Sequence, residues 1–178
     1  MSNIVETKHL GEVLKNHSQD MTGKVVVITG TTSGTGFVCA NEVAKKGATV
    51  VLLNRESERS ESALQQLQGA VPNGKFDAIT CDLQSFKSVQ NAVNSIKNKY
   101  EVVDVLVNNA GVMALKDQAT EDGYDVQMQT NVLSHFLITK ELFPLLKKGE
   151  DGRGVNHSSM ARLGPPLASE YFEKKGGN

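Results

Sequence analysis

A run of glycine and hydroxyl residues, Thr29–Gly36 (TGTTSGTG), directly follows the β-branched apolar segment Val25–Thr29 and precedes a helical pattern. Glycine permits a tight turn with positive φ and carries no Cβ that would block a bound anion. A helix beginning here offers free backbone N–H groups and the positive end of its dipole. Hydroxyl donors are added by Thr31, Thr32, Ser33 and Thr35. The predicted chemistry is pyrophosphate binding, and the alternative is a tight glycine-rich turn that binds no ligand.

Polar candidates also follow later apolar segments. Asn54-Arg55 ends the second such segment without a carboxylate, and a guanidinium can pair with phosphate through bidentate hydrogen bonds. The alternative for Arg55 is an ordinary solvated loop charge. Asp82 follows the third segment and is interpreted either as a ligand-binding residue or as a cap of the next helix. Asn131 lies inside a predicted helix, where asparagine is unfavourable and therefore requires a reason.

Apolar runs and helical patterns alternate along the chain. The predicted strands are 25–29, 48–54, 76–80, 102–107 and 154–156, and the predicted helices are 37–46, 56–68, 85–99 and 120–147. Because continuous apolar runs are typical of strands covered on both faces, this alternation predicts right-handed crossovers and a parallel sheet. The expected fold class is α/β, with a doubly wound parallel sheet of about five strands.

Composition excludes several classes of protein. The 178 residues carry a net charge of −1, which favours neither nucleic acid nor an anionic membrane surface. The two cysteines, Cys39 and Cys81, and the four histidines lack metal-ligand spacing, so no metal site is predicted. No apolar run approaches the roughly 18 residues of a membrane span, and the N-terminus lacks a signal-peptide pattern. We therefore expect a cytoplasmic protein without a membrane span.

Several motifs occur in one order: T-G-x-x-x-G-x-G at Thr29–Gly36, N-N-A-G at Asn108–Gly111, T-N-V at Thr130–Val132 and V-N-H-S-S at Val155–Ser159. From the first motif to about residue 160, the chain resembles the short-chain dehydrogenase/reductase family. The stretch DGYDVQMQTNVLSHFLITKELFPLL resembles its retinol-dehydrogenase-like branch, although that branch more often has glycine where Ser134 stands. The resemblance implies a Rossmann-type sheet that is incomplete, since the family has about seven strands.

The resemblance also implies roles for individual residues. The cofactor-binding set is Gly30, Thr32, Ser33, Gly34, Thr35, Gly36, Asn54, Arg55, Asp82, Leu83, Asn109, Ala110 and Gly111. Arg55 favours NADP(H) over NAD(H). Asn131 is assigned to a helix kink and to the water of a proton relay. Ser159 is assigned to orienting the substrate oxygen, and Ser158 is the alternative if the alignment with the family motif shifts by one residue.

The family's general acid/base is a tyrosine followed four residues later by a lysine on the same helix face. Tyr171 and Lys175 have this spacing, but Gly164-Pro165-Pro166 precedes them and Gly176-Gly177 follows. This context favours a loop or short helix at these residues, with the family's catalytic tyrosine and lysine missing from the sequence. Residues 1–22 are predicted as an amphipathic leader, 23–160 as the dinucleotide-binding domain and 161–178 as an incomplete C-terminal segment.

Two functional hypotheses follow. The first is an NADP(H)-dependent oxidoreductase that transfers hydride between nicotinamide and a small alcohol or carbonyl substrate. The alternative is a catalytically incomplete fragment or pseudoenzyme that binds dinucleotide without turnover. Family members commonly dimerise or tetramerise, so a homo-oligomer is also implied, and the sequence leaves the oligomeric state and the substrate open.

Overall fold

The computed structural model describes residues 8–17, 19–164 and 168–173. Its strands are β1 (Val25–Thr29), β2 (Thr49–Asn54), β3 (Lys75–Thr80), β4 (Val105–Asn108) and β5 (Arg153–Asn156). The main helices are α1 (Lys8–His17), α2 (Gly34–Lys45), α3 (Glu58–Ala70), α4 (Phe86–Lys99), α5 (Val126–Met128) and α6 (Ser134–Leu146). A π-helix, η1 (Gln129–Leu133), joins α5 to α6, and two 3₁₀ helices, η2 (Met160–Leu163) and η3 (Ser169–Phe172), follow β5.

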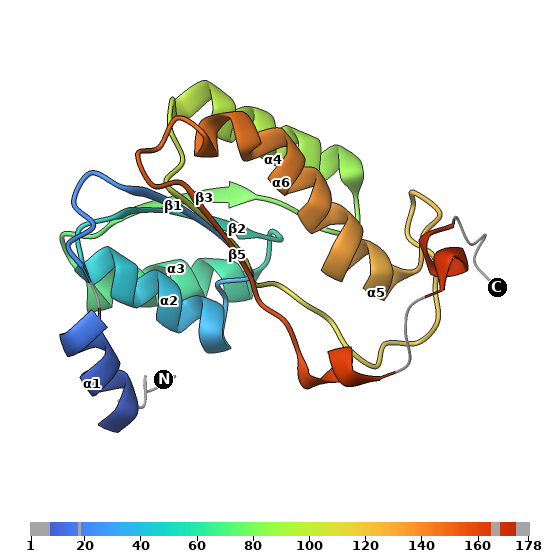
Figure 1. Cartoon of the computed structure of the whole chain (residues 1–178), viewed down its shortest axis with the longest axis horizontal. Helices are drawn as coiled ribbons and strands as arrows, with labels where there is room; N and C mark the ends of the chain where they lie inside the picture. Colours follow the sequence, from blue (N-terminus) through green and yellow to red (C-terminus); the bar gives the residue numbers. More distant parts are fainter. Residues whose placement is uncertain (1–7, 18, 165–167, 174–178) are drawn as a thin grey trace.

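The five strands form one parallel sheet in the order β3-β2-β1-β4-β5. Helices α2 and α3 cover one face, and α4 and α6 cover the other (Figure 1). The chain moves outward from β1 to β3 and then crosses back to the other side of β1, where it forms β4. The sheet therefore reverses its direction of growth between β1 and β4, as in Rossmann-type folds. The predicted α/β fold with a five-stranded, doubly wound parallel sheet is confirmed.

The central strands are apolar without interruption because both of their faces are covered. On one face, Val27, Val51 and Leu106 pack with Ile96 and Ile138. On the other face, the neighbouring strand residues pack against Phe37 and Ala40 of α2 and against Ala63 and Leu67 of α3. Strand β5 differs, because every one of its four residues is exposed. The buried part of the sheet is thus its β1–β2–β4 centre, and the site residues lie at the carboxyl ends of these strands.

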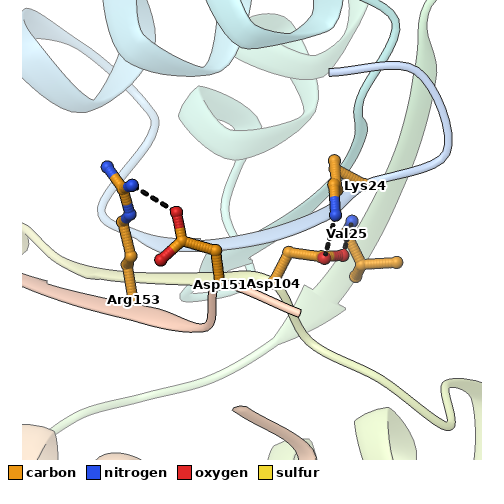
Figure 2. Close-up of polar contacts among 5 residues, drawn as sticks. All are labelled: Lys24, Val25, Asp104, Asp151 and Arg153. Atoms are coloured by element: carbon orange, nitrogen blue, oxygen red, sulfur yellow. Dashed lines mark hydrogen bonds and ion pairs between the residues drawn. The ribbon is translucent and has the colours of Figure 1, made fainter. Parts of the chain in front are cut away.

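The amino edge of the sheet is held by charged residues (Figure 2). The carboxylate of Asp104, just before β4, accepts hydrogen bonds from Lys24 Nζ at 3.0 Å and from the Val25 backbone N–H at 2.8 Å. Arg153 at the start of β5 pairs with Asp151. Asp104 is only 8% exposed, and these donors replace the water that its buried side chain has lost. The Lys24–Asp104 contact therefore sets where β1 and β4 begin relative to each other.

Three predicted boundaries are wrong. Helix α2, predicted to begin at Phe37, already begins at Gly34 inside the glycine loop. The predicted helix 120–147 begins only at Val126, since Gly123 has a positive φ of 84° and residues 120–124 form a turn. Asp125 then caps the helix by accepting hydrogen bonds from the backbone N–H groups of Gln127 (3.0 Å) and Met128 (2.8 Å). The predicted strand 102–107 begins only at Val105, and before it the Val103 N–H donates to the Leu145 carbonyl of α6 at 3.3 Å rather than to a neighbouring strand.

Candidate functional site

A cavity of about 460 Å³ opens at the carboxyl edge of the sheet, where the sheet reverses between β1 and β4. Crevices at this position are the usual ligand sites of open α/β sheets. Most of the predicted cofactor-binding residues line the cavity, namely Gly30, Thr32, Ser33, Thr35, Gly36, Asn54, Arg55, Asp82, Leu83, Asn109, Ala110 and Gly111. The structure therefore brings together predicted residues that are up to 81 positions apart in the sequence, Gly30 and Gly111.

Each of the three loop positions requires glycine for a different physical reason. Gly30 has a φ of +71°, and a Cβ there would lie 2.8 Å from the Cα of Ala110. A Cβ on Gly36 would lie 2.3 Å from the Gly30 carbonyl oxygen and 2.4 Å from Asn109 Nδ2. Gly34 has a φ of +59°, and its missing Cβ would meet no atom within 4 Å. Gly30 and Gly36 thus serve internal packing, whereas Gly34 leaves open space at the helix start.

Helix α2 begins at this open space, and its first N–H groups have no intrahelical partner by geometry. Ser33 is the N-cap residue, yet its side chain makes no capping hydrogen bond. Its hydroxyl instead accepts a hydrogen bond of 2.6 Å from Arg59 Nη2 of α3. The N–H groups and the helix dipole therefore remain available to an anion, and the site fits a pyrophosphate.

The tip of β2 forms the end of the cavity where the family resemblance places the adenosine. The Asn54 side chain faces the loop: Oδ1 accepts from the Thr31 N–H, and Nδ2 donates to Thr31 Oγ1, both at 2.8 Å. Thr31 is fully buried, so the prediction that its hydroxyl adds a donor for the ligand is wrong. Arg55 in the loop after β2 and Arg59 in the first turn of α3 are both exposed, and both line the cavity.

Asp82 and Leu83 line the same cavity after β3. The Asp82 carboxylate accepts a hydrogen bond of 3.0 Å from the Gln84 N–H, which closes a local turn. The cap of α4 is Ser85, whose hydroxyl accepts from the Ser88 N–H, so Asp82 is not the cap residue. Next to it, burial and the charge of Asp82 raise the pKa of the Cys81 thiol to about 12, which keeps this thiol protonated and unreactive.

The Asn109–Gly111 turn is anchored on Thr29, the last residue of β1. Thr29 Oγ1 accepts hydrogen bonds from the backbone N–H groups of Asn109 and Ala110, both at 3.0 Å. Asn109 Nδ2 donates in return to the carbonyl oxygens of Thr29 (2.9 Å) and Gly30 (3.0 Å). The N-N-A-G motif therefore locks the glycine loop to β4, which is a structural role beside any contact with a ligand.

A second cavity of about 640 Å³ adjoins the first and shares residues 109–112 and His157 with it. It is lined by Asn131, Ser158 and Ser159, so the two predicted catalytic residues face one space. Asn131 sits in the π-helix η1, where Oδ1 accepts from the Val112 N–H and Nδ2 donates to the Val112 carbonyl, both at 2.8 Å. This clamp explains an asparagine inside a helix. The assigned roles of Asn131 and Ser159 stay predictions.

The Tyr171 and Lys175 pair falls at the end of the described chain. Tyr171 lies in the 3₁₀ helix η3, and Lys175 lies outside the described residues. The cap of η3, Glu173, has extended backbone with φ −79° and ψ 155°. A helix that would place positions 171 and 175 on one face is therefore not continuous through residue 173.

Sequence reasoning missed several residues of the site. Arg59 had a usable signal, because it stands four residues after Arg55 at the start of a helix. Thr29 belongs to the predicted strand and to the phosphate-loop motif, but its hydroxyl was given no role, although a hydroxyl at the last strand position can bind a neighbouring turn. His135 and His157 were considered only as metal ligands, and both line the second cavity.

The chain belongs to the short-chain dehydrogenase family, whose sequence profile matches residues 24–176. An oxidoreductase of Schizosaccharomyces pombe is 40% identical over 163 residues, covering 88% of this chain and 48% of that protein. Retinol dehydrogenase 13 of Homo sapiens is 38% identical over 141 residues, covering 79% of this chain and 43% of that protein. The chain thus spans less than half the length of these two relatives.

Solved structures agree with the fold. A short-chain dehydrogenase of Escherichia coli CFT073 complexed with NADPH matches with a TM-score of 0.70 at 28% identity, covering 86% of this chain and 67% of that one. A short-chain dehydrogenase of Shigella flexneri complexed with NADP matches with a TM-score of 0.69 at 27% identity, with the same coverage. The family uses nicotinamide dinucleotides, and the residues around the first cavity fit such a group.

Two further features concern the described residues only. Among them, no group of His, Cys, Asp and Glu side chains is placed to bind a metal ion. In the same part of the chain, no helix combines the length and apolar character that crossing a bilayer requires.

Proposed function

We propose that the chain is the NADP(H)-binding part of an oxidoreductase that acts on an alcohol or carbonyl compound. The observation that carries the proposal is the pair of cations, Arg55 and Arg59, at the adenosine end of the first cavity. The tip of β2 presents an amide, Asn54, where a carboxylate would repel a 2′-phosphate. Arg59 already donates to Ser33 at 2.6 Å, so its guanidinium lies within reach of the phosphate loop.

The bound nicotinamide would supply the hydride acceptor or donor, and the chain's own residues would position it. The N–H groups at the start of α2 would bind the pyrophosphate, and Asp82 and Leu83 would line the adenine side. The second cavity would receive the substrate, with Ser159 orienting its oxygen. Exposed Met113, Val132 and Phe136 beside that cavity favour an apolar substrate, in keeping with the name of retinol dehydrogenase 13.

The test is titration of the chain with NADPH and NADH, followed by nicotinamide fluorescence. We expect NADPH to bind more tightly, and Arg55→Gln and Arg59→Gln each to weaken NADPH about tenfold, the factor expected from losing a hydrogen bond to a charged group. NADH affinity should stay unchanged. Arg153→Gln is the matched control, because Arg153 pairs with Asp151 at the opposite edge of the sheet. Equal or tighter binding of NADH would contradict the NADP(H) preference.

The second candidate function is dinucleotide binding without turnover. It is favoured by the backbone around Tyr171, which lies in a four-residue 3₁₀ helix. The assay is oxidation of simple primary and secondary alcohols with NADP⁺ and reduction of the matching carbonyl compounds with NADPH. Binding with no turnover supports this second function. Turnover that is lost in Tyr171→Phe supports the oxidoreductase and would assign the acid to Tyr171.

The remaining expectations are part of the same proposal. We propose a cytoplasmic location, in keeping with Cys39 and Cys81, which are both free thiols. The homo-oligomer stays a prediction that size-exclusion chromatography with light scattering can test.

A further inference from the structure

His135 is a buried titratable residue on α6 that no role above uses. Its side chain is at the wall of the second cavity, and the residue is only 6% exposed. The ring has two polar neighbours: Nδ1 lies 3.0 Å from the Asn131 carbonyl oxygen, and Nε2 lies 2.9 Å from Thr29 Oγ1. A buried imidazole with a partner on each nitrogen is fixed in orientation.

Counting donors assigns the protons in this network. A carbonyl oxygen only accepts, so Nδ1 must carry the proton that bonds to Asn131. The two lone pairs of Thr29 Oγ1 are taken by the N–H groups of Asn109 and Ala110. The Thr29 hydroxyl must therefore donate, and Nε2 of His135 at 2.9 Å is a closer acceptor than the Val107 carbonyl at 3.5 Å. His135 is thus neutral with its proton on Nδ1. Burial lowers the pKa of the imidazole, which also favours the neutral form.

Both neighbours of the ring act on one short segment of the chain. Thr29 holds the backbone of Asn109 and Ala110, and the Asn131 side chain holds both backbone groups of Val112. Residues 109–112 line both cavities, and they are the part of the site that the two spaces share. His135 is the residue that joins these two anchors, since it bonds to Thr29 and to the backbone of Asn131.

We propose that His135 is a positioning residue, which fixes the 109–112 segment between the two cavities and thereby the nicotinamide end of the bound dinucleotide. The inference rests on the proposed dinucleotide binding. His135 acts through Thr29 and Asn131 and carries no chemistry of its own. The adenosine end is held by other elements, β2, α3 and the turn after β3, so His135 affects it little.

The experiment compares two probes on the same variants. NADPH occupies both ends of the site, whereas adenosine 2′,5′-bisphosphate occupies the adenosine end alone. For His135→Phe we expect NADPH affinity to fall about tenfold, the factor of a lost buried hydrogen bond, with the bisphosphate affinity unchanged. His135→Gln can present its side-chain oxygen to Thr29 and should restore most NADPH affinity. Ile138→Val, one turn later on α6 and fully buried, is the packing control and should change neither affinity.

The outcomes separate this inference from the proposed function. If the unsubstituted chain does not bind NADPH, the proposed function fails. If it binds and His135→Phe binds NADPH equally well, or loses both probes equally, the positioning role is overturned. A measurement on the unsubstituted chain tests the inference even if His135→Phe does not fold. Nitrogen-15 NMR of the imidazoles should show His135 protonated on Nδ1 and bare on Nε2, and the opposite tautomer would overturn the inference.

Discussion

Replacing Gly36 by alanine tests the contact between the phosphate loop and the turn after β4. The added Cβ would lie 2.3 Å from the carbonyl oxygen of Gly30 and 2.4 Å from Asn109 Nδ2. Real Cβ contacts are far longer, so the loop or the Asn109 side chain must move. Such overpacking of a well-packed site costs about 1–3 kcal/mol. Because one of the close atoms is backbone, we expect a loss of about 2 kcal/mol or more in the free energy of unfolding.

The matched control is Gly69→Ala. Gly69 is the penultimate residue of α3, and a Cβ there would meet no atom within 4 Å. Alanine is favoured over glycine in a helix by about 0.5–1 kcal/mol at interior positions, so this change near the helix end should leave the stability unchanged or raise it by less than that. Urea denaturation followed by circular dichroism measures both variants, and NADPH titration should show weaker binding for Gly36→Ala alone. Equal denaturation midpoints for Gly36→Ala and the unsubstituted chain would refute the described contact.

Three further predictions concern other parts of the chain. Asp104→Asn should lower the free energy of unfolding by about 1.5–3 kcal/mol, because it weakens the charge-assisted hydrogen bonds from Lys24 and Val25 (Figure 2). An unchanged midpoint of urea denaturation would contradict this prediction. Burial and the hydrogen bond to Asp77 raise the pKa of Tyr100 above the value of about 10 that it has in the unfolded chain. The neutral phenol therefore contributes its full share to the free energy of unfolding below about pH 10, and this share is lost as the pH rises through the pKa of the folded state. Tyr100→Phe should therefore flatten the decline of Tm above that pH, and an equally steep decline argues against the assignment. Burial holds the Cys81 thiol protonated, so in a Cys39→Ser chain Ellman's reagent at pH 8 should label Cys81 only after the chain is unfolded in urea. Rapid labelling of the folded chain would contradict this prediction.

The parts of the fold that follow from local physics could be predicted from the sequence. Strands β1 and β2 are buried on both faces, and burial of that kind leaves a continuous apolar run that needs no knowledge of the partner strands. The glycine loop was predictable for a similar reason, since the residue types there reflect backbone geometry. The parallel, doubly wound character of the sheet was predictable from the alternation of strands and helices and from the family resemblance, whereas the strand order β3-β2-β1-β4-β5 comes from the structure.

What the sequence could not predict depends on partners far along the chain. The turn before α5 is fixed by Asp122, whose carboxylate accepts hydrogen bonds from the Phe86 N–H of α4 at 2.8 Å and from the fully buried Gln129 side chain at 2.6 Å. The roles of Thr29 and His135 arise because positions 106 residues apart meet at 2.9 Å. No local pattern contains such a contact. The same holds for Arg59, whose hydrogen bond to Ser33 spans two elements.

The central claim is that the N–H groups at the start of α2 bind the pyrophosphate of a dinucleotide. The most direct measurement is a nitrogen-15 heteronuclear spectrum of the chain during titration with NADPH, with adenosine as the phosphate-free control. We expect the amide resonances of Gly34, Thr35 and Gly36 to shift strongly and to saturate with NADPH, and to stay nearly unmoved with adenosine. Unmoved resonances at these three residues in saturating NADPH would contradict the account.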